Sequence, residues 1–359
     1  MDSQPVLDQA KVDAFNQRAN NDLSGGWSSI MCYLGDQLCL FRILAEAGPL
    51  TAAELAVRAG VNERYTTEWL ASLACAGYLA YDPADGGFSL PPEHAPTLTD
   101  TGTYSYLGGA HHLFASLMGV LEPVAQAFRQ GGAVHPSAYP AQVWHAIDRC
   151  TSPTWELELI PKWLPALPEV HARLDAGAAL ADIGCGHGKA LIKLAQTYPR
   201  AHFVGYDAYG PSVAQATANA EAAGVADRVR FHESNVIGGL PEQYDVVTTF
   251  DVIHDAADPV GLLRAIHQAV KPDGAYILMD QSVLPSLADH AAAPGAAGFA
   301  TSYALSLFYC MSVSLGQAGA GLGTCGLPEP RVRELCAEAG FRSVRRLPFD
   351  DSAVYEVRP

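Results

Sequence analysis

Short apolar runs alternate with helical patterns through the second half of the chain. Runs typical of strands lie at residues 178–181, 203–207, 229–233, 244–250 and 275–280. Helical patterns separate several of these runs, at residues 189–195 and 259–270. A final helix over Pro330–Ala339 precedes two more runs, at residues 341–347 and 353–357, which we expect to pair antiparallel. The alternation predicts an α/β fold.

The first hundred residues follow a different pattern. After apolar Leu38–Leu44, the sequence Thr51-Ala52-Ala53-Glu54 forms a capping box that opens a short helix. A second helix over about Asn62–Ala76 is followed by two short runs, Tyr78–Tyr81 and Phe88–Leu90, which predict a hairpin. Two helices and a hairpin in this order predict a winged helix.

We therefore divide the chain into three parts. A winged-helix domain is expected over residues 1–105, a helical connector over 106–170 and a Rossmann-like domain over 171–359. The last part carries an insertion at about 281–326. Within it, an apolar helix over Tyr303–Met311 and several later glycines are compatible with a lid over a site or with a core helix joined by a flexible loop.

Composition narrows the class of protein. At 359 residues with 49% apolar residues, the chain is long enough for two domains with sizeable cores. Its formal net charge of −16 argues against general affinity for nucleic acid or for an anionic membrane. The polar segment Met1–Lys11 does not have the pattern of a signal peptide, so we expect a cytoplasmic protein.

The eight cysteines show no paired CxxC spacing, and one of them lies inside a glycine-rich turn. We expect free thiols rather than disulfides or zinc ligands. The sequence also lacks an evident set of closely spaced acidic metal ligands, so no metal is expected from the spacing.

The glycine-rich turn 182–188, Asp-Ile-Gly-Cys-Gly-His-Gly, lies between the first strand and the first helix of the α/β pattern. Glycines there let the backbone approach a nucleotide-like ligand, and the helix that follows offers unpaired N–H groups. Lys189 stands where a dinucleotide fingerprint needs a third glycine, which disfavours a pyrophosphate ligand. Asp182 suits a ligand with an ammonium group, such as S-adenosylmethionine (SAM), and Asp207 ends the next strand, where a ribose diol is bound in such folds.

With these elements the chain resembles the class I SAM-dependent methyltransferases, which implies a Rossmann-like, seven-stranded sheet. The resemblance implies that the cofactor, whose product is S-adenosylhomocysteine, contacts Asp182, Gly184, Cys185, Gly186, Gly188, Asp207, Asn235 and Val236. Members usually have aspartate where this chain has Asn235, beside the adenine amine. Asp251 either faces the methionine end of the cofactor or simply ends a strand.

The triplet Ile253-His254-Asp255 resembles the segment that carries the general base in plant-type small-molecule O-methyltransferases. A histidine can remove a proton near neutral pH as a methyl group is transferred in line. The alternatives are that His254 only hydrogen-bonds the backbone or forms a wall of the pocket. Asp255 either orients the histidine ring or caps a helix.

A winged helix also occurs in DNA-binding regulators, so a SAM-responsive transcription factor is the alternative of another class. Residues 1–100 contain five basic side chains against thirteen acidic ones, a balance that would repel DNA. Sequences such as Glu63-Arg64-Tyr65 and Gly321-Leu322-Gly323-Thr324 resemble the actinobacterial small-molecule methyltransferases in particular. In that group and the plant-type enzymes the winged helix dimerises and covers the substrate pocket, which implies a homodimer.

These observations predict methyl transfer from SAM to a small molecule, most simply at an oxygen deprotonated by His254. Transfer to nitrogen or sulfur remains an alternative, as does a SAM-fold protein that has drifted to another reaction, such as hydroxylation or decarboxylation. His111 and His112, at the start of the connector helix, are candidates for substrate contact, although paired histidines at a helix start are also common surface or capping groups.

Overall fold

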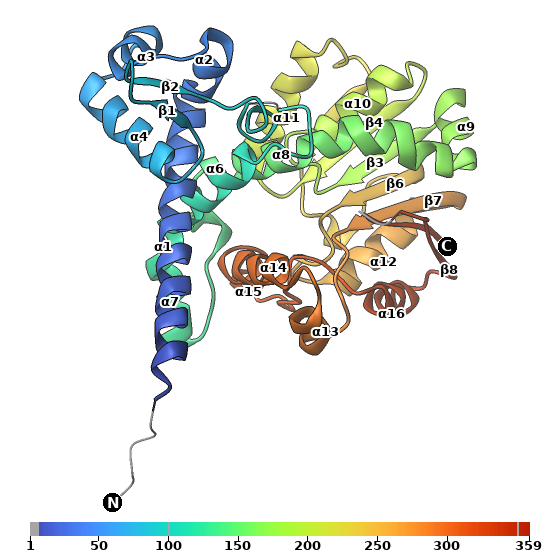
Figure 1. The fold of residues 1–359 in the computed structure, drawn as a ribbon. Helices are drawn as coiled ribbons and strands as arrows, with labels where there is room; N and C mark the ends of the chain where they lie inside the picture. The colour runs from blue at the N-terminus through green and yellow to red at the C-terminus, as the bar shows by residue number, and fades with distance from the viewer. Residues whose placement is uncertain (1–6, 100, 350–351) are drawn as a thin grey trace, which may run out of the picture. The chain divides into compact units, whose positions relative to one another are not determined.

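A computed structural model describes residues 7–99, 101–349 and 352–359. Residues 1–6, which are part of the segment considered as a signal peptide, lie outside the described residues. So does Asp100, one of the acidic residues counted in the first hundred. The chain divides into two compact units, Met1–Ser116 and Leu117–Pro359, which we call unit 1 and unit 2 (Figure 1).

Unit 1 contains the predicted winged helix. Its elements are α1 (Gln9–Gln37), α2 (Leu40–Ala47), α3 (Ala52–Ala59), α4 (Glu63–Cys75), β1 (Ala80–Asp82), β2 (Gly87–Ser89), α5 (Ala95–Leu98) and α6 (Gly108–Leu117), the last of which ends one residue into unit 2. The capping box is confirmed, since Thr51 accepts from the N–H of Glu54 and the Glu54 side chain accepts from the N–H of Thr51. The hairpin is also confirmed, as β1 and β2 pair antiparallel.

Helix α1 was not predicted. It runs for 29 residues from the N-cap Asp8, and only Ser28, Cys32 and Gly35 are buried. Because most of its length makes no core contacts, it lacks the apolar stripe that reveals a surface helix in a sequence. At its buried end, a Cβ on Gly35 would lie 2.5 Å from the Trp69 ring, so glycine there permits close packing.

Unit 2 is built on a seven-stranded sheet in the order β5-β4-β3-β6-β7-β9-β8. The strands are β3 (Ala179–Ile183), β4 (His202–Asp207), β5 (Val229–Glu233), β6 (Tyr244–Phe250), β7 (Val270–Asp280), β8 (Ser343–Arg346) and β9 (Ala353–Arg358). Strands β3 to β7 are parallel, whereas β9 runs antiparallel to both β7 and β8. The predicted Rossmann-like sheet and its antiparallel end are confirmed. β7 begins at Val270, five residues before the predicted run at 275–280.

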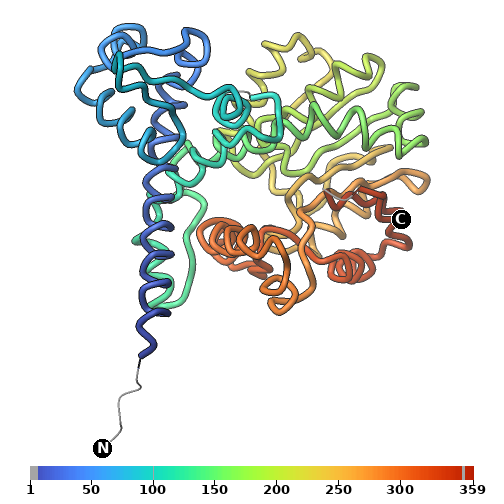
Figure 2. Tube along the Cα trace, viewed as in Figure 1, coloured from blue at the N-terminus to red at the C-terminus, as the bar shows by residue number. Residues whose placement is uncertain are grey.

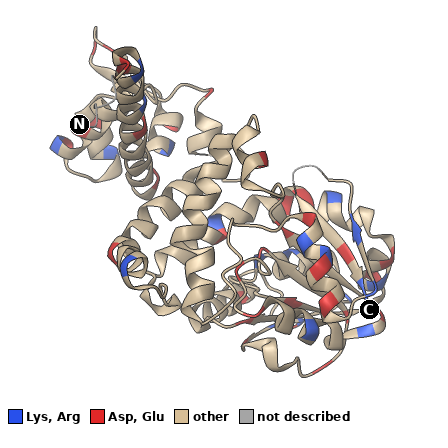
Figure 3. Cartoon of the chain, turned by 90° about the horizontal axis from the view of Figure 1, so that it is seen from below, with Lys and Arg blue, Asp and Glu red and all other residues tan. Residues whose placement is uncertain are grey.

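Helices precede and connect these strands. They are η1 (Met118–Val120), α7 (Leu121–Gln130), η2 (Pro136–Ala138), α8 (Gln142–Thr154), the π-helical η3 (Trp155–Trp163), η4 (Leu164–Ala166), α9 (Pro168–Ala176), α10 (Lys189–Thr197), α11 (Gly210–Ala222), η5 (Val236–Gly238), α12 (Pro259–Ala269), α13 (Leu287–Ala292), α14 (Ala296–Phe308), α15 (Cys310–Gly316) and α16 (Glu329–Ala339). Acidic and basic residues are interspersed over the part of the unit that surrounds the sheet (Figure 3).

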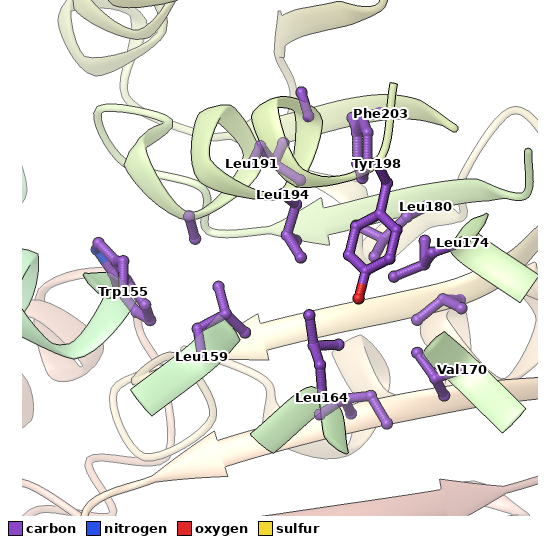
Figure 4. Close-up of a cluster of buried hydrophobic side chains, with 14 of the residues drawn as sticks. Trp155, Leu159, Leu164, Val170, Leu174, Leu180, Leu191, Leu194, Tyr198 and Phe203 are labelled. Atoms are coloured by element: carbon purple, nitrogen blue, oxygen red, sulfur yellow. The ribbon is translucent and has the colours of Figure 1, made fainter. Parts of the chain in front are cut away.

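Two hydrophobic clusters cover the two faces of the sheet. Alternate residues of one strand point to opposite faces, and accordingly Leu180 belongs to one cluster and Ala181 to the other. The first cluster includes Trp155, Leu191 and Tyr198 from the surrounding helices (Figure 4). Both cores fix the carboxyl ends of β3, β4 and β6, where ligands bind in open α/β sheets.

The insertion between β7 and α16 is helical (Figure 2). By length and composition alone, residues Ala296–Gly316 would pass as a membrane span, and 22% of that window is buried. The predicted single helix over Tyr303–Met311 is wrong, because the chain breaks at Tyr309, with φ −136° and ψ −81°. Each of the two helices is too short for the roughly 17–25 residues that a span needs.

Candidate functional site

The glycine turn connects β3 to α10 with three left-handed residues. Gly184, Gly186 and Gly188 have φ values of +72°, +51° and +76°, which L side chains rarely adopt. A Cβ on Gly184 would lie 2.5 Å from Val252, and one on Gly188 would lie 2.4 Å from Phe231. Nothing lies within 4 Å of the corresponding position at Gly186. The turn is therefore packed at both ends and open in the middle.

Asp207 holds the open middle of the turn in place. Its carboxylate accepts from the N–H of Gly186 at 2.9 Å and from the N–H of Tyr209 at 2.9 Å. Burial raises the pKa of Asp207, and these backbone hydrogen bonds act in the opposite direction. Each carboxylate oxygen has a second lone pair, so a ligand diol can still be bound.

Asp182 is 3% exposed at the carboxyl end of β3, and the hydroxyl of Thr248 donates to it at 2.7 Å. Burial, together with repulsion from Asp207, raises the pKa of Asp182 to about 7. Two carboxylates beside one turn are unfavourable when no cation is near. The pair is suited to a positively charged ligand.

A cavity of about 570 Å³ opens beside the turn, and all the residues that line it belong to unit 2. Its size is in the range of small-molecule and cofactor sites. Eight residues expected at the cofactor line it: Asp182, Gly184, Cys185, Gly186, Asp207, Asn235, Val236 and Asp251. Gly188 does not, because it precedes α10 as N-cap and faces the Phe231 ring.

Asn235 follows β5 as expected, but its side chain already has a partner. The amide oxygen caps η5 by accepting from the N–H of Ile237 at 3.2 Å. The adjacent Val236 is 3% exposed and packs in the core. Asn235 thus shapes the loop that lines the cavity, and its oxygen retains one lone pair for a ligand.

His254 lies after β6 and is paired with a residue that the sequence analysis did not identify. Its Nδ1 lies 2.7 Å from Oδ1 of Asp280, the last residue of β7, and its backbone N–H donates to the same carboxylate. Burial alone lowers the pKa of His254, but attraction to Asp280 and nearby acids outweighs it and the pKa is raised. The sequence predicts both strands but not that they are neighbours, and the pairing of β6 with β7 is what brings Asp280 to His254.

Two further acids, Asp251 and Asp255, lie near His254 in the chain, whereas the Nδ1 of its ring is held by Asp280. Asp251 has a left-handed backbone with φ +57°, and its carboxylate accepts from Gln281 at 2.9 and 3.1 Å. Burial raises the pKa of Asp251 to about 6 and that of Asp255 to about 7. Asp255 lines the cavity, as does Val252, whereas His254 is 4% exposed and does not line it.

His111 and His112 lie in α6, within unit 1. Nε2 of His112 is 2.7 Å from Oδ2 of Asp36, and the other carboxylate oxygen, Oδ1, accepts from the Tyr106 hydroxyl at 2.7 Å. Burial lowers the pKa of His111. These contacts give His112 a structural role in unit 1, and neither histidine lines the cavity.

An aromatic wall of the cavity was missed. Trp144 packs against Tyr209 and Tyr309, with ring centroids 4.8 and 5.6 Å apart, and all three line the cavity. The indole N–H of Trp144 is buried and has no acceptor among the described residues. Lys189 also lines the cavity, with its ammonium group 2.7 Å from Asp148. Trp144 comes from the connector and Tyr309 from the insertion, and no local motif indicates where these two segments lie.

Comparison with known proteins supports this assignment of the fold. Residues 174–300 match a family described as methyltransferase domain, and residues 26–100 match the Rv2258c-like winged HTH domain. The structure of mitomycin 7-O-methyltransferase is similar with a TM-score of 0.71 and 21% identity, covering 98% of this chain and 99% of that one. The chain has a methyltransferase domain of the class I fold, preceded by a winged-helix domain.

Two curated relatives are similar in sequence. Ubiquinone biosynthesis O-methyltransferase of Ruegeria pomeroyi is 36% identical over 28% of this chain, and the match spans only 40% of that protein. The 3-amino-4-hydroxybenzoate 4-O-methyltransferase of Streptomyces cremeus is 25% identical over 76% of this chain and 75% of its own length. The second match includes both units.

Proposed function

We propose that the protein transfers the methyl group of SAM to an oxygen atom of a small-molecule acceptor. The observation that carries this proposal is the open glycine turn between Asp182 and Asp207 at the cavity of about 570 Å³. Two buried carboxylates suit the ammonium and sulfonium charges of SAM, and Asp207 is positioned for a ribose diol. The mitomycin and 3-amino-4-hydroxybenzoate enzymes, which share the fold, are named for transfer to oxygen.

SAM supplies an electrophilic methyl carbon when bound, and the residues of the chain align the acceptor and take its proton. His254 does not itself line the cavity, but its neighbours Val252 and Asp255 do, so the acceptor binds close to it. Nε2 of His254 accepts the proton of the hydroxyl as its oxygen attacks the methyl carbon. When SAM is bound, the electron pair of the broken carbon–sulfur bond would leave with S-adenosylhomocysteine. Asp280 stabilises the imidazolium that results, since it holds Nδ1–H at 2.7 Å.

We also propose that the protein acts as a cytoplasmic homodimer without nucleic-acid or membrane partners. Arg64, the basic residue of α4, is paired with Glu68, so the helix that would enter a DNA groove offers no free cation. The division into a winged-helix domain over 1–105, a connector over 106–170 and a catalytic domain over 171–359 belongs to the same proposal. His111 and His112 would serve the winged-helix unit rather than the acceptor.

Calorimetry with SAM and S-adenosylhomocysteine tests the cofactor, and a panel of phenols and hydroxybenzoates with radiolabelled SAM tests the reaction. We expect saturable binding of both nucleosides and transfer to at least one hydroxyl acceptor. Folded protein that binds neither nucleoside would refute the proposal. Transfer only to amines or thiols would instead establish the alternative nucleophile.

A further inference from the structure

Two cysteines from the insertion lie close to His254. One ligand atom each from His254, Cys310 and Cys325 lies within 4.8 Å of the other two. Cys310 is the first residue of α15 and is 2% exposed, and Cys325 lies in the loop before α16. The two cysteines are fifteen positions apart, a spacing that resembles no zinc motif. No metal site was therefore predicted from the sequence.

The three ligand atoms have the chemistry and spacing of a site for a soft divalent cation. Tetrahedral zinc, with bonds of about 2.3 Å to sulfur and about 2.0 Å to nitrogen, places its ligand atoms roughly 3.5–3.8 Å apart. The observed limit of 4.8 Å needs only a small contraction to reach that geometry. Two thiolates and one imidazole leave a fourth position open.

Asp280 completes the arrangement around the histidine. It occupies Nδ1 at 2.7 Å and so leaves Nε2 as the atom available to a metal. Metal-binding histidines commonly hold a carboxylate with their other ring nitrogen, which fixes the ring and strengthens the donor. Asp280 is fully buried, so this orientation is rigid.

The backbone around Cys325 is built in an unusual conformation. Thr324 and Cys325 have φ values of +57° and +59°, which non-glycine residues rarely adopt. The thiols of Cys310 and Cys325 hydrogen-bond each other, so this conformation brings the two sulfurs together. The carboxylates of Asp251 and Asp255 lie nearby and add negative charge that favours a cation.

We propose that Nε2 of His254 and the sulfurs of Cys310 and Cys325 bind one Zn²⁺ ion. Binding displaces the two thiol protons to solvent, and also the Nε2 proton where the imidazole is protonated. The ion then holds the lone pair that His254 would use to accept a proton. This last consequence, inhibition of methyl transfer by zinc, rests on the proposed function, whereas the site itself does not.

Cobalt titration of the full chain, kept reduced and without SAM, tests the site directly. Co²⁺ is expected to bind at one equivalent with a thiolate-to-metal charge-transfer band and the intense visible bands of a tetrahedral ion, and Zn²⁺ should bleach both. The variants C310S and C325S should each lose most of the charge-transfer intensity and bind zinc at least tenfold more weakly. C75S, which changes an exposed cysteine, is the matched control and should titrate like the parent chain.

Absence of the bands in folded protein, or bands that survive in both C310S and C325S, would overturn the proposal. Thermal melts of each variant establish that the chain has folded before it is titrated. D280N supplies a further test, since removal of the carboxylate on Nδ1 should weaken zinc binding by roughly 10–100-fold. Unchanged affinity in D280N would contradict the assigned histidine nitrogen.

Activity is measured separately once an acceptor is known. Zinc should inhibit the parent enzyme over the concentrations at which it bleaches cobalt, and C325S should require at least tenfold more zinc for the same inhibition. Cobalt bands in a chain that transfers no methyl group would leave the metal site standing and refute only the proposed function. Methyl transfer without any cobalt band would do the reverse.

Discussion

Replacing Asp182 by asparagine should stabilise the ligand-free protein and weaken its binding of the cofactor. In the native state, burial and repulsion from Asp207 raise the pKa of Asp182 from its ordinary 3.8 to about 7. A raised carboxyl pKa destabilises the folded chain progressively as pH rises from about 4 and fully above about 7. The difference corresponds to about 4 kcal/mol above that pH.

Asparagine has the same shape and can still accept from Thr248, but it carries no charge. D182N should therefore raise the free energy of unfolding by up to about 4 kcal/mol at pH 8.5 and by little near pH 4. Denaturant unfolding at both pH values measures this. D245N is the matched control, with an expected effect of opposite sign. Lys271 and the N–H of Ala179 help to hold the pKa of Asp245 below its usual range, so loss of its negative charge should lower the free energy of unfolding near neutral pH.

Cofactor binding supplies the second half of the experiment. At pH 6 the parent chain must release a proton from Asp182 when a cationic ligand binds, so calorimetry in two buffers of different ionisation enthalpy should give different heats. D182N should show no such proton release and should bind SAM at least tenfold more weakly at pH 8.5. If D182N gains no more free energy of unfolding at pH 8.5 than near pH 4, the reasoning is refuted. The pKa of Asp182 would then not be raised in the folded state.

Three further outcomes are expected. H254A should lower kcat by roughly 100-fold or more and leave the Kd for SAM nearly unchanged, measured by single-turnover assays and calorimetry; equal turnover would contradict the role of base. In chelator-treated enzyme, kcat should rise with pH through a midpoint above 6.5, because the pKa of His254 is raised and only the neutral imidazole accepts a proton. A pH–rate profile of D280N should show that midpoint at lower pH, because Asp280 helps to raise the pKa of His254. G188A should lower the free energy of unfolding by about 1–2 kcal/mol or more, because its φ is +76° and its Cβ would meet Phe231; a thermal melt equal to that of the parent would contradict this.

The sequence predicted those parts of the molecule whose causes are local. Thr51 and Glu54 define a helix start within four residues, and the glycine turn with Asp182 and Asp207 follows directly from strand, turn and helix. Asp280 and Cys325 were missed for one physical reason. Asp280 lies 26 residues after His254 and Cys325 lies 71 residues after it, and only the pairing of β6 with β7 and the folding of the insertion bring them to His254.

Helix α1 was missed for the opposite reason. Its residues are mostly exposed, so neither burial nor periodicity marks them. Similarly, nothing in the apolar sequence around Tyr309 indicates a break, which arises where the side chain packs against Tyr139 and Trp144. The hydrophobic pattern of a sequence indicates which face of a helix is buried. It does not indicate where a helix ends because of a contact with a residue far away in the chain.

The position of β9 between β7 and β8 has a consequence for biosynthesis. This strand follows every other strand of the sheet in the chain, yet it contributes fully buried residues such as Val354 and Tyr355. Until the ribosome has delivered residues up to Arg358, β7 presents an unpaired edge to the cell. Nascent chains of this protein are thus exposed to edge-to-edge aggregation until β9 has been synthesised, and chaperones that shield such an edge should matter most in that interval.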